Sequence, residues 1–380
     1  MTKALLPAGC YDLLPPQARQ ESELSSALLS VFESFGYEQV SPPLLEYSDS
    51  LLAGRGAALS PQIFRVMDPG AHKVMGLRAD ITLQIARIAV SRLAHAPRPL
   101  RLCYNGLILR MQGEGLKDDR QLRQAGIELI GAASPEADAE VILVAAEALK
   151  RAGVSKLSID LNLPGIVGSL LAAEKLDNEQ AEKLFAAVAH KDVSTIKTFS
   201  FGYRESLMGL LQCAGPADAA LAAMQKLDLP ESAKSQCRDL QEVVKILSQS
   251  GSKEWTLTID ATESRSLAYH SGISFSIFVP GVAFEVGRGG RYATQGGVGA
   301  ASEATGFTLY VETLRGLLPE PKRGKRIFVS EGISSKDAAK LRADGYVTVY
   351  ALTEYGHGED EAKRLGCGYI YEHGKIKELK

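Results

Sequence analysis

The chain has 380 residues, of which 45% are hydrophobic and 23% charged, a composition typical of a globular protein with a packed core. At roughly 100–200 residues per domain, this length predicts two or three domains. Lys and Arg number 43 against 45 Asp and Glu, so the basic surplus typical of nucleic-acid-binding proteins is absent, although a local basic patch stays compatible with the total.

Targeting and redox signals are sparse. No apolar run approaches the roughly 18 residues that span a membrane, and the N-terminal stretch MTKALLPAGCYDLLPP lacks the apolar region and cleavage site of a signal peptide. The cysteines are odd in number and form no CxxC pair, which favours free, buried or half-buried thiols in a reducing cytoplasm. The histidines have no metal-ligand spacing. We therefore expect a cytoplasmic protein without metal or cofactor.

The first hundred residues predict alternating helices and extended segments. Apolar residues recur at helical spacing from Leu24 to Phe35, and Gly36 supplies a stop. The segment YEQVSPPLLEY is extended, because its two prolines forbid a helix interior. Short strands are expected between residues 63 and 82 around the turn Asp68-Pro69-Gly70, followed by a helix from about residue 81 into the 90s.

The next segments continue this alternation. Residues 101–131 predict two strands around the polar turn GEGLKDD. A helix opens at Ser134, with this serine as its cap and Pro135 as its first residue, and runs to Gly153. A strand follows at residues 157–161.

The second half of the chain begins with an Ala-, Leu-, Lys-, Glu- and Gln-rich stretch, residues 165–250, which predicts a helical insertion. Strands are expected at WTLTID, ISFSIF and VAFEV, followed by Gly-rich turns and a helix through about Leu318. The polar, proline-containing segment PEPKRGKR is typical of a linker, and it leads to a small α/β tail, residues 325–380. This tail is too short to bury a strong core alone, so we expect it to dock on its neighbour or on a second chain.

Three parts of the sequence combine charged residues with glycines in patterns that a purely structural role explains poorly. They are LRADIT at residues 77–82, RMQGEGLKDDRQLRQAGIE at residues 110–128, and SRSLAYH (264–270) together with VGRGGRY (286–292).

The order and spacing of these segments resemble the class II aminoacyl-tRNA synthetase core, specifically that of histidyl-tRNA synthetase. GYEQVSPPLLE resembles motif 1, LRADIT the family's LRPE-G-T segment, and RLCYNGLILRMQ with RQLRQAGIELIG motif 2 and its return strand. SRSLAYH resembles the histidine-specific RGLDYY-type signature, and GRGGRY with TGFTLYVETL resembles motif 3 and its approach. The match covers about residues 6–318.

The resemblance implies an α+β fold. A class II synthetase-like core, an antiparallel sheet flanked by helices, would occupy residues 1–320 and include the helical insertion. The tail is similar to part of the synthetase anticodon-binding domain but shorter, so no tRNA is expected as a partner.

The resemblance also implies an L-histidine pocket. Asp80 stands where the family has a glutamate that holds the α-amino group, and Arg110 is the motif 2 arginine, which contacts the carboxylate. The positions that hold the amino group and the imidazole, or complete the pocket, are Gln124, Glu128, Arg265, Tyr269 and Tyr292. This set suits a zwitterion with an imidazole, because it offers anions to the ammonium, a cation to the carboxylate, and hydrogen-bonding groups to the ring.

Each of these residues also has an ordinary structural explanation. The acids and arginines could form salt bridges with one another, and the tyrosines could be core aromatics. His270 replaces a tyrosine of the family signature. GRGGRY lacks the Gly-Lys-Ser/Thr of a phosphate-binding loop, so tight turns and close backbone approach explain its glycines better.

The family's ATP site is not kept. Thr313 stands where motif 3 has an arginine, Gln112 replaces the motif 2 glutamate, and Gly113 and Asp118 replace basic loop residues. Fewer cations to neutralise a triphosphate would weaken ATP binding, and Asp118 would repel phosphate.

An intact amino-acid pocket beside a lost ATP site resembles the ATP phosphoribosyltransferase regulatory subunits, which are synthetase paralogues. The resemblance implies a non-catalytic chain that binds and activates the short-form catalytic subunit and mediates feedback inhibition by L-histidine in the first step of histidine biosynthesis. It also implies a homodimer through the core within a hetero-oligomer, of which a hetero-octamer is one form. The alternatives are an active histidyl-tRNA synthetase, another ATP-dependent ligase, and a scaffold with a vestigial pocket.

Overall fold

The computed structural model describes residues 5–113, 118–174, 176–250, 255–263, 270–294, 302–321, 324–329, 333–352 and 357–379. The chain divides into two compact units, one of Met1–Leu13 with Glu21–Leu318 and one of Leu14–Gln20 with Pro319–Lys380. Within the described ranges, no helix is long and apolar enough to cross a membrane.

A nine-stranded sheet forms the centre of the first unit. Neighbouring strands are antiparallel except for the pairs β1–β5 and β7–β9. With helices on both faces, this sheet confirms the predicted α+β class. The strands, in sheet order, are β1 (Glu38–Gln39), β5 (Leu100–Leu109), β6 (Gln121–Ile130), β12 (Glu303–Tyr310), β11 (Gly287–Ala293), β10 (Ser274–Phe278), β7 (Leu157–Asn162), β9 (Trp255–Ile259) and β8 (Gly215–Pro216).

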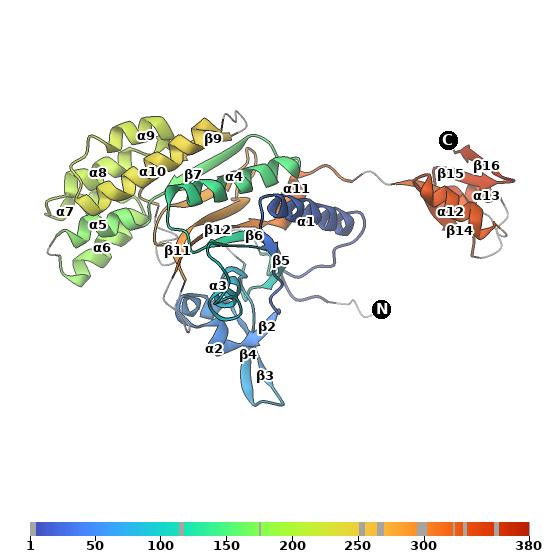
Figure 1. Ribbon diagram of the computed structural model, residues 1–380, viewed down its shortest axis with the longest axis horizontal. Coiled ribbons are helices and arrows are strands. Elements are labelled where there is room, and N and C mark those ends of the chain that lie inside the picture. The colour runs from blue at the N-terminus through green and yellow to red at the C-terminus, as the bar shows by residue number, and fades with distance from the viewer. Residues whose placement is uncertain are drawn as a thin grey trace. The chain divides into compact units, whose positions relative to one another are not determined.

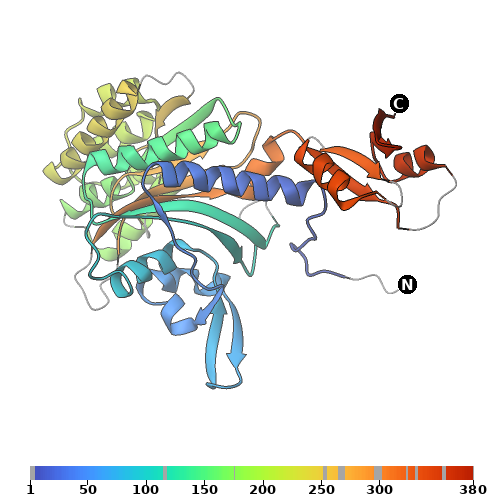
Figure 2. The same ribbon diagram turned by 45° about the vertical axis from the view of Figure 1, so that its right-hand side comes forward.

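The two faces of this sheet are covered by different helices. Helices α1 (Gln17–Ser34), α4 (Pro135–Arg151) and α11 (Val311–Leu317) lie along one face, and α3 (Thr82–Ser91) lies on the other (Figures 1 and 2). Side chains alternate along each strand, so consecutive residues serve opposite faces. Ile127 and Phe307 join the main core under α1 and α4, whereas Tyr104 and Tyr292 join a smaller cluster with α3.

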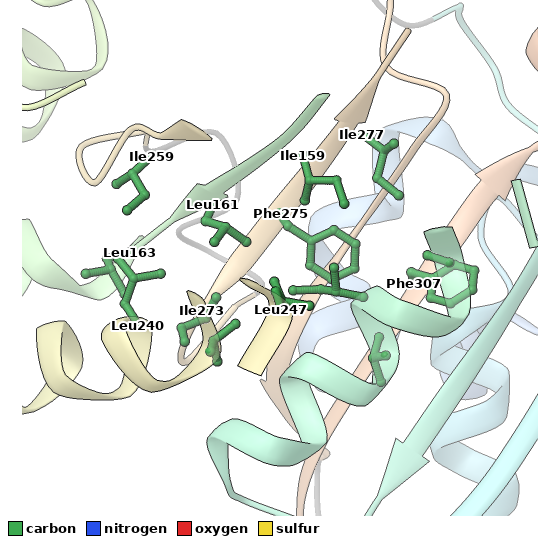
Figure 3. Packing of buried hydrophobic residues seen from close by; sticks show 14 of the residues in the cluster. Ile159, Leu161, Leu163, Leu240, Leu247, Ile259, Ile273, Phe275, Ile277 and Phe307 are labelled. Atoms are coloured by element: carbon green, nitrogen blue, oxygen red, sulfur yellow. The ribbon is translucent and has the colours of Figure 1, made fainter. Parts of the chain in front are cut away.

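The helical region predicted at residues 165–250 shares the main core. Leu240 of this region lies in the same buried cluster as Ile159 and Phe275 of the sheet (Figure 3). The region is therefore a continuous part of the first unit. It contains α5 (Gly165–Ala172), α6 (Asn178–Ala189), α7 (Val193–Thr198), α8 (Arg204–Gln212), α9 (Ala217–Met224) and α10 (Glu231–Gln249), with the short strand β8 between α8 and α9.

A three-stranded antiparallel sheet precedes α3. It consists of β2 (Leu45–Tyr47), β4 (Lys73–Leu77) and β3 (Phe64–Asp68), in that order, and α2 (Ser48–Leu51) and the 3₁₀ helix η1 (Gly54–Gln62) lie between its first two strands in sequence. The turn at Asp68 forms as predicted: the Asp68 Oδ1 accepts a hydrogen bond from the Gly70 N–H at 2.9 Å.

The second unit has its own sheet and two small buried clusters. One cluster contains Phe328 and Ile370, and the other contains Ile327, Val329 and Leu341. That this tail docks on its neighbour or on a second chain remains a prediction. Its sheet order is β14 (Tyr346–Tyr350), β13 (Lys325–Val329), β15 (Tyr369–Glu372) and β16 (Lys375–Glu378), with helices α12 (Ser335–Ala343) and α13 (Gly358–Arg364).

The prediction of a strand at VAFEV, residues 282–286, was wrong. The chain is irregular there, and the strand β11 is formed by the glycine-rich residues that were expected to be turns. The glycines are required by close packing: a Cβ on Gly289 would lie 2.3 Å from the Gly306 carbonyl oxygen and 2.7 Å from the Phe275 ring. Close backbone approach, and not a turn, explains this sequence.

Two helix ends also differ from expectation. Ser134 occupies the cap position of α4 with Pro135 next, but its side chain makes no cap hydrogen bond. Its carbonyl instead accepts from the Arg291 Nη2 at 2.6 Å. Helix α1 ends at Ser34, so Phe35 turns out of the apolar face and is exposed, while Gly36 takes the left-handed conformation of a stop.

Candidate functional site

The α3 face of the large sheet is lined by glycines that leave room for large polar side chains. A Cβ on Gly306 would lie 2.1 Å from the Glu128 Oε2, and a Cβ on Gly126 would lie 2.6 Å from the Tyr104 hydroxyl. Gly306 is the register partner of Glu128, so the absence of a side chain there is what lets the glutamate lie against β12. These glycines create a polar layer on an otherwise apolar sheet.

Glu128 lies within this layer with Tyr292 of β11. Glu128 is 1% exposed and Tyr292 is 3% exposed, and the tyrosine hydroxyl donates to the Glu128 Oε2 at 2.8 Å. Burial raises the pKa of Glu128 to about 8, and the charge of Asp80 adds to the rise, while hydrogen bonds from Tyr292 and Thr82 oppose it. The carboxyl group can therefore carry or release a proton near neutral pH.

Asp80 and Gln124 join the loop before α3 to strand β6. The Gln124 Nε2 donates to the Asp80 Oδ2 at 2.9 Å, and the Gln124 Oε1 accepts from the Ile81 N–H at 3.0 Å. The Asp80 Oδ1 accepts from the Thr82 N–H at 2.9 Å. Gln124 is thus fixed at both ends of its amide, and it holds the Asp80 carboxylate beside the polar layer.

Arg110 places a positive charge beside the same loop. It follows directly after β5, it is buried, and its Nε donates to the Ala79 carbonyl oxygen at 3.3 Å. Its backbone N–H donates to the Arg120 carbonyl oxygen at 2.8 Å, which sets the direction of the chain after β5. The site therefore holds a guanidinium beside the loop that carries Asp80, and the deeply buried carboxyl group of Glu128.

The structure brings together five of the seven residues predicted for the site, namely Asp80, Arg110, Gln124, Glu128 and Tyr292. The other two, Arg265 and Tyr269, lie outside the described residues.

Sequence reasoning missed the hydroxyl groups behind the carboxylates. The Tyr104 hydroxyl lies 2.7 Å from the Thr308 Oγ1 and 3.3 Å from the Thr82 Oγ1. Complete burial raises the pKa of Tyr104 well above its ordinary value, so its phenol stays protonated. Tyr104 lies in an apolar strand pattern that gives no sign of this role; only the polar residues on neighbouring strands reveal it.

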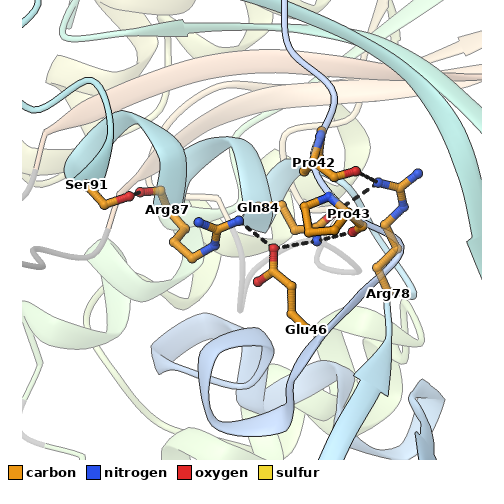
Figure 4. Close-up of polar contacts among 7 residues, drawn as sticks. All are labelled: Pro42, Pro43, Glu46, Arg78, Gln84, Arg87 and Ser91. Atoms are coloured by element: carbon orange, nitrogen blue, oxygen red, sulfur yellow. Dashed lines mark hydrogen bonds and ion pairs between the residues drawn. The ribbon is translucent and has the colours of Figure 1, made fainter.

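Arg78 holds the site loop against two other segments. Its Nη1 donates to the Pro42 carbonyl oxygen at 2.8 Å, and its Nε donates to the Leu107 carbonyl oxygen at 2.7 Å. Gln84 bridges the neighbouring carbonyl of Pro43 and the Glu46 carboxylate, which also pairs with Arg87 (Figure 4). The predicted motif 1 prolines are thus fixed to β5 and α3 through side-chain hydrogen bonds.

The positions assigned to a lost ATP site carry little free positive charge. Gln112 and Asp118 are exposed, and Thr313 lies in α11. Arg123 and Arg315 lie on the opposite face of the sheet, that of α1 and α11, where Arg123 pairs with Glu21 at 2.8 Å and Arg315 lies 3.9 Å from the same carboxylate.

His270 lies near β11 without forming a metal site. Its Nδ1 is 3.3 Å from the Arg291 carbonyl oxygen. In the part of the chain that the structure describes, no three His, Cys, Asp or Glu residues are grouped so as to hold a metal ion.

The chain is similar to two sets of known proteins. The family model described as histidyl-tRNA synthetase matches residues 9–314. A relative from Paramagnetospirillum magneticum, called ATP phosphoribosyltransferase regulatory subunit, is 46% identical over 96% of this chain and 95% of its own length. A relative of the same description from Rhodospirillum centenum is 42% identical over 99% of this chain and 96% of its own length.

A solved structure shares the fold along almost the whole chain. It is described as an ATP phosphoribosyltransferase regulatory subunit/histidyl-tRNA synthetase from Bacillus halodurans, is 25% identical, and superposes with a TM-score of 0.84 over 95% of this chain and 96% of that one. Together with the family match over the sheet and its polar layer, these similarities show that the chain belongs to the histidyl-tRNA synthetase family and, within it, to the ATP phosphoribosyltransferase regulatory subunits.

Proposed function

We propose that this chain is a non-catalytic subunit that binds and activates the short-form catalytic subunit of ATP phosphoribosyltransferase in the cytoplasm. In this role it also transmits feedback inhibition by L-histidine to the first step of histidine biosynthesis. The chain forms a homodimer through its core within the larger hetero-oligomer. What supports the regulatory role is membership of the family whose relatives carry that description.

The observation that carries the histidine part of the proposal is the pairing of Glu128 with Tyr292 beside Asp80 and Gln124. Two carboxyl groups and a phenol lie within one polar layer, and the Arg110 guanidinium contacts the loop that carries Asp80. Free histidine presents an ammonium, a carboxylate and an imidazole with two ring nitrogens, and each finds a complementary group in this set. Arg265 and Tyr269 complete the proposed pocket.

The loss of charged residues from the family's ATP site supports the proposed lack of catalysis. ATP-dependent adenylation needs cations that neutralise a triphosphate and its transition state. Thr313 offers only a hydroxyl group where the family has a guanidinium, and Gly113 and Asp118 stand where it has basic loop residues. We infer that the site recognises an amino acid without activating it.

Allosteric inhibition requires that histidine bind one state of the complex more tightly than another. Glu128 and Tyr292 come from two different strands, and Asp80 comes from the loop before α3. A ligand that contacts all three would restrain these elements relative to one another, and such a restraint can be transmitted to a partner chain.

The decisive experiment is an assay of purified short-form catalytic subunit with and without this chain. We expect a large increase in rate on addition of the chain and its reversal by L-histidine. No activation would overturn the regulatory role, and ATP–pyrophosphate exchange dependent on histidine would restore an active synthetase in its place.

A variant separates histidine sensing from activation. Glu128→Gln can no longer ionise when a ligand binds but keeps the size and the acceptor for Tyr292, so we expect normal activation with histidine inhibition weakened by about tenfold or more. The control is Glu179→Gln, an exposed acid on α6 that pairs only with Lys183 among the described residues. Unchanged inhibition in Glu128→Gln, with no histidine binding by calorimetry in the wild type, would leave a scaffold with a vestigial pocket.

A further inference from the structure

A chain of three hydroxyl groups lies behind the Glu128 carboxyl group on the α3 face of the large sheet. The Thr308 Oγ1 is 2.7 Å from the Tyr104 hydroxyl, which is 3.3 Å from the Thr82 Oγ1. Thr82 in turn forms a hydrogen bond with the Glu128 carboxyl group. All four side chains are buried, so they make these hydrogen bonds to one another rather than to bulk water.

The fold makes room for this chain at one glycine. Gly126 of β6 is the register partner of both Tyr104 on β5 and Thr308 on β12, and a Cβ on it would lie 2.6 Å from the Tyr104 hydroxyl. Gln124 and Glu128 lie two residues to either side of Gly126, so their side chains share its face of the sheet. The two hydroxyl groups therefore lie in the row between the residue proposed for the amino group of histidine and the residue proposed for its imidazole.

A chain of hydroxyl groups can run in two directions, because each hydroxyl donates one hydrogen bond and also accepts. When Glu128 is ionised, the carboxylate only accepts, and the three hydroxyl groups donate in turn toward it. When Glu128 is protonated, it donates to Thr82 and the direction reverses. Tyr104 then donates to the Thr308 hydroxyl or to the Phe307 carbonyl oxygen, 3.4 Å away. The chain thus satisfies both protonation states of a buried carboxyl group without a change of fold.

The groups that face Glu128 bring its two protonation states close in energy. Tyr292 of β11 donates to the carboxyl group at 2.8 Å, whereas the charge of Asp80, in the loop before α3, opposes its ionisation. Strands β5 and β12 and helix α3 contribute the neutral hydroxyl groups of the chain. Burial raises the pKa of Glu128 to about 8, and a free imidazole has a pKa of about 6.5, so near neutral pH the acid holds a proton and the ring does not.

We propose that Tyr104 and Thr308 are positioning residues of the histidine site, which act through Thr82 so that Glu128 shares a single proton with the bound imidazole. This inference rests on the proposed function, because it concerns the same site. When histidine binds, the O–H bond of Glu128 breaks and the proton bonds to a ring nitrogen. The result is a carboxylate beside an imidazolium, with the three hydroxyl groups donating toward the carboxylate.

The test is a calorimetric titration of the full chain with L-histidine in buffers of different ionisation enthalpy, together with ¹⁵N NMR of ring-labelled histidine. At about pH 5.5, free histidine is already an imidazolium, so binding should release about one proton from Glu128. At about pH 7.2, Glu128 supplies the proton to the ring, so almost none should be exchanged with the buffer. The bound ring should give imidazolium signals at both pH values.

The variants Tyr104→Phe and Thr308→Val each remove one hydroxyl group at nearly constant size. Each should weaken histidine binding about threefold to tenfold and move the signals of the bound ring toward those of neutral imidazole, because the ionised Glu128 loses donors. Thr308→Ser keeps the hydroxyl group and should restore both readouts. A purely structural role of these residues would weaken binding but leave the ring signals unchanged.

The matched control is Tyr37→Phe. Tyr37 is also buried and donates to a carboxylate, that of Glu140 at 3.0 Å, but it belongs to the main core on the other face of the sheet. This variant should leave the affinity and the ring signals unchanged. Histidine binding with a neutral ring, or wild-type affinity and ring signals in Tyr104→Phe and Thr308→Val, would overturn the inference and leave the proposed function in place. No histidine binding by the wild type would overturn the proposed pocket and the inference with it.

Discussion

At the scale of single residues, Glu128 is the group whose chemistry depends most on the fold. Its carboxyl group is enclosed between β6, β11 and β12, with hydrogen bonds from Tyr292 and Thr82 and no room for a side chain on Gly306. A carboxylate in this position loses almost all of its hydration, which is why its proton is held to near-neutral pH.

This shift predicts a pH dependence of stability. The pKa of Glu128 is about 8 in the folded state and 4.5 in the unfolded state. Between these two pH values, the carboxyl group is protonated in the folded protein and ionised in the unfolded protein. The contribution of Glu128 to the free energy of unfolding is therefore fully present below about pH 4.5 and is lost as the pH rises through 8. Glu128→Gln should therefore be nearly neutral at pH 5 and should raise the free energy of unfolding by about 2–4 kcal/mol at pH 8.

Denaturation of both proteins at pH 5 and pH 8 checks this prediction. Glu312, whose pKa burial raises to about 7, titrates in the same direction in both proteins, so the difference between them isolates Glu128. A difference that does not grow with pH would show that Glu128 is already ionised in the folded protein.

Gly306 offers a steric test of the same site. In Gly306→Ala the new Cβ would lie 2.1 Å from the Glu128 Oε2 and 2.4 Å from the Ile127 carbonyl oxygen, so the backbone of β6 or β12 must shift. We expect a loss of about 2–4 kcal/mol in the free energy of unfolding, together with loss of histidine binding.

The control for this variant is Gly316→Ala in α11, where an added Cβ meets nothing within 4 Å. Alanine is favoured over glycine within a helix, so this change should leave stability unchanged or raise it by up to about 1 kcal/mol. Equal effects of the two substitutions in urea denaturation would contradict the steric explanation.

At the scale of elements, Arg78 connects segments that are far apart in sequence. Its donors reach the carbonyl oxygens of Pro42 and Leu107, and both carbonyl groups lose this donor if the guanidinium is removed. Arg78→Met should cost about 2–4 kcal/mol of unfolding free energy, because it leaves buried acceptors unpaired.

Arg98→Met is the matched control for Arg78→Met. Like Arg78, Arg98 donates to backbone carbonyl groups, in this case those of Ala89, Leu93 and Ala96. Arg98 is exposed, however, so water can replace its guanidinium as the donor. The loss should stay below about 1 kcal/mol. A chemical denaturation series that ranks the two variants the other way would show that burial does not decide the effect.

The sequence predicted most helices and strands because their apolar periodicity is strong. Helix α1, the pair β5–β6 and the helical region from α5 to α10 all appear where the pattern places them. It failed at β11, because glycine-rich strands carry no periodic signal and owe their form to neighbours such as Phe275 and Gly306. Long-range packing of this kind cannot be read from local sequence.

The candidate site was predictable only where a motif marks it. Asp80, Arg110, Gln124, Glu128 and Tyr292 stand in recognisable segments, and the fold brings them together. Tyr104 and Thr308 were missed because each resembles an ordinary strand residue until the register of β5, β6 and β12 is known.

At the scale of the whole molecule, the described residues form buried clusters that each belong to one unit. The three clusters of the sheet and its helices contain residues between Leu24 and Leu318, and the two of the tail contain residues beyond Lys325. Each unit therefore has its own hydrophobic stabilisation.

A chain truncated after Leu318 should accordingly remain folded. We expect unchanged helical circular dichroism per residue and histidine binding within about twofold of the full chain. The catalytic subunit serves as a second probe: retained histidine binding with lost activation would place the tail in partner contact. Loss of cooperative unfolding in the truncated chain would show that the two units stabilise each other.

The alternation of Arg291 and Tyr292 along β11 has a consequence for how this protein can diverge. A single-residue insertion or deletion within β11 would exchange its two faces, moving the guanidinium toward Glu128 and the phenol toward Asp138. One such event would break the Tyr292–Glu128 hydrogen bond and the ion pair between Arg291 and Asp138 of α4 at once, whereas a two-residue change would restore the faces but shift both contacts along the strand. Descendants of this chain can therefore change length in the loops that flank β11 far more readily than within it, because side chains on both faces of the strand have fixed partners.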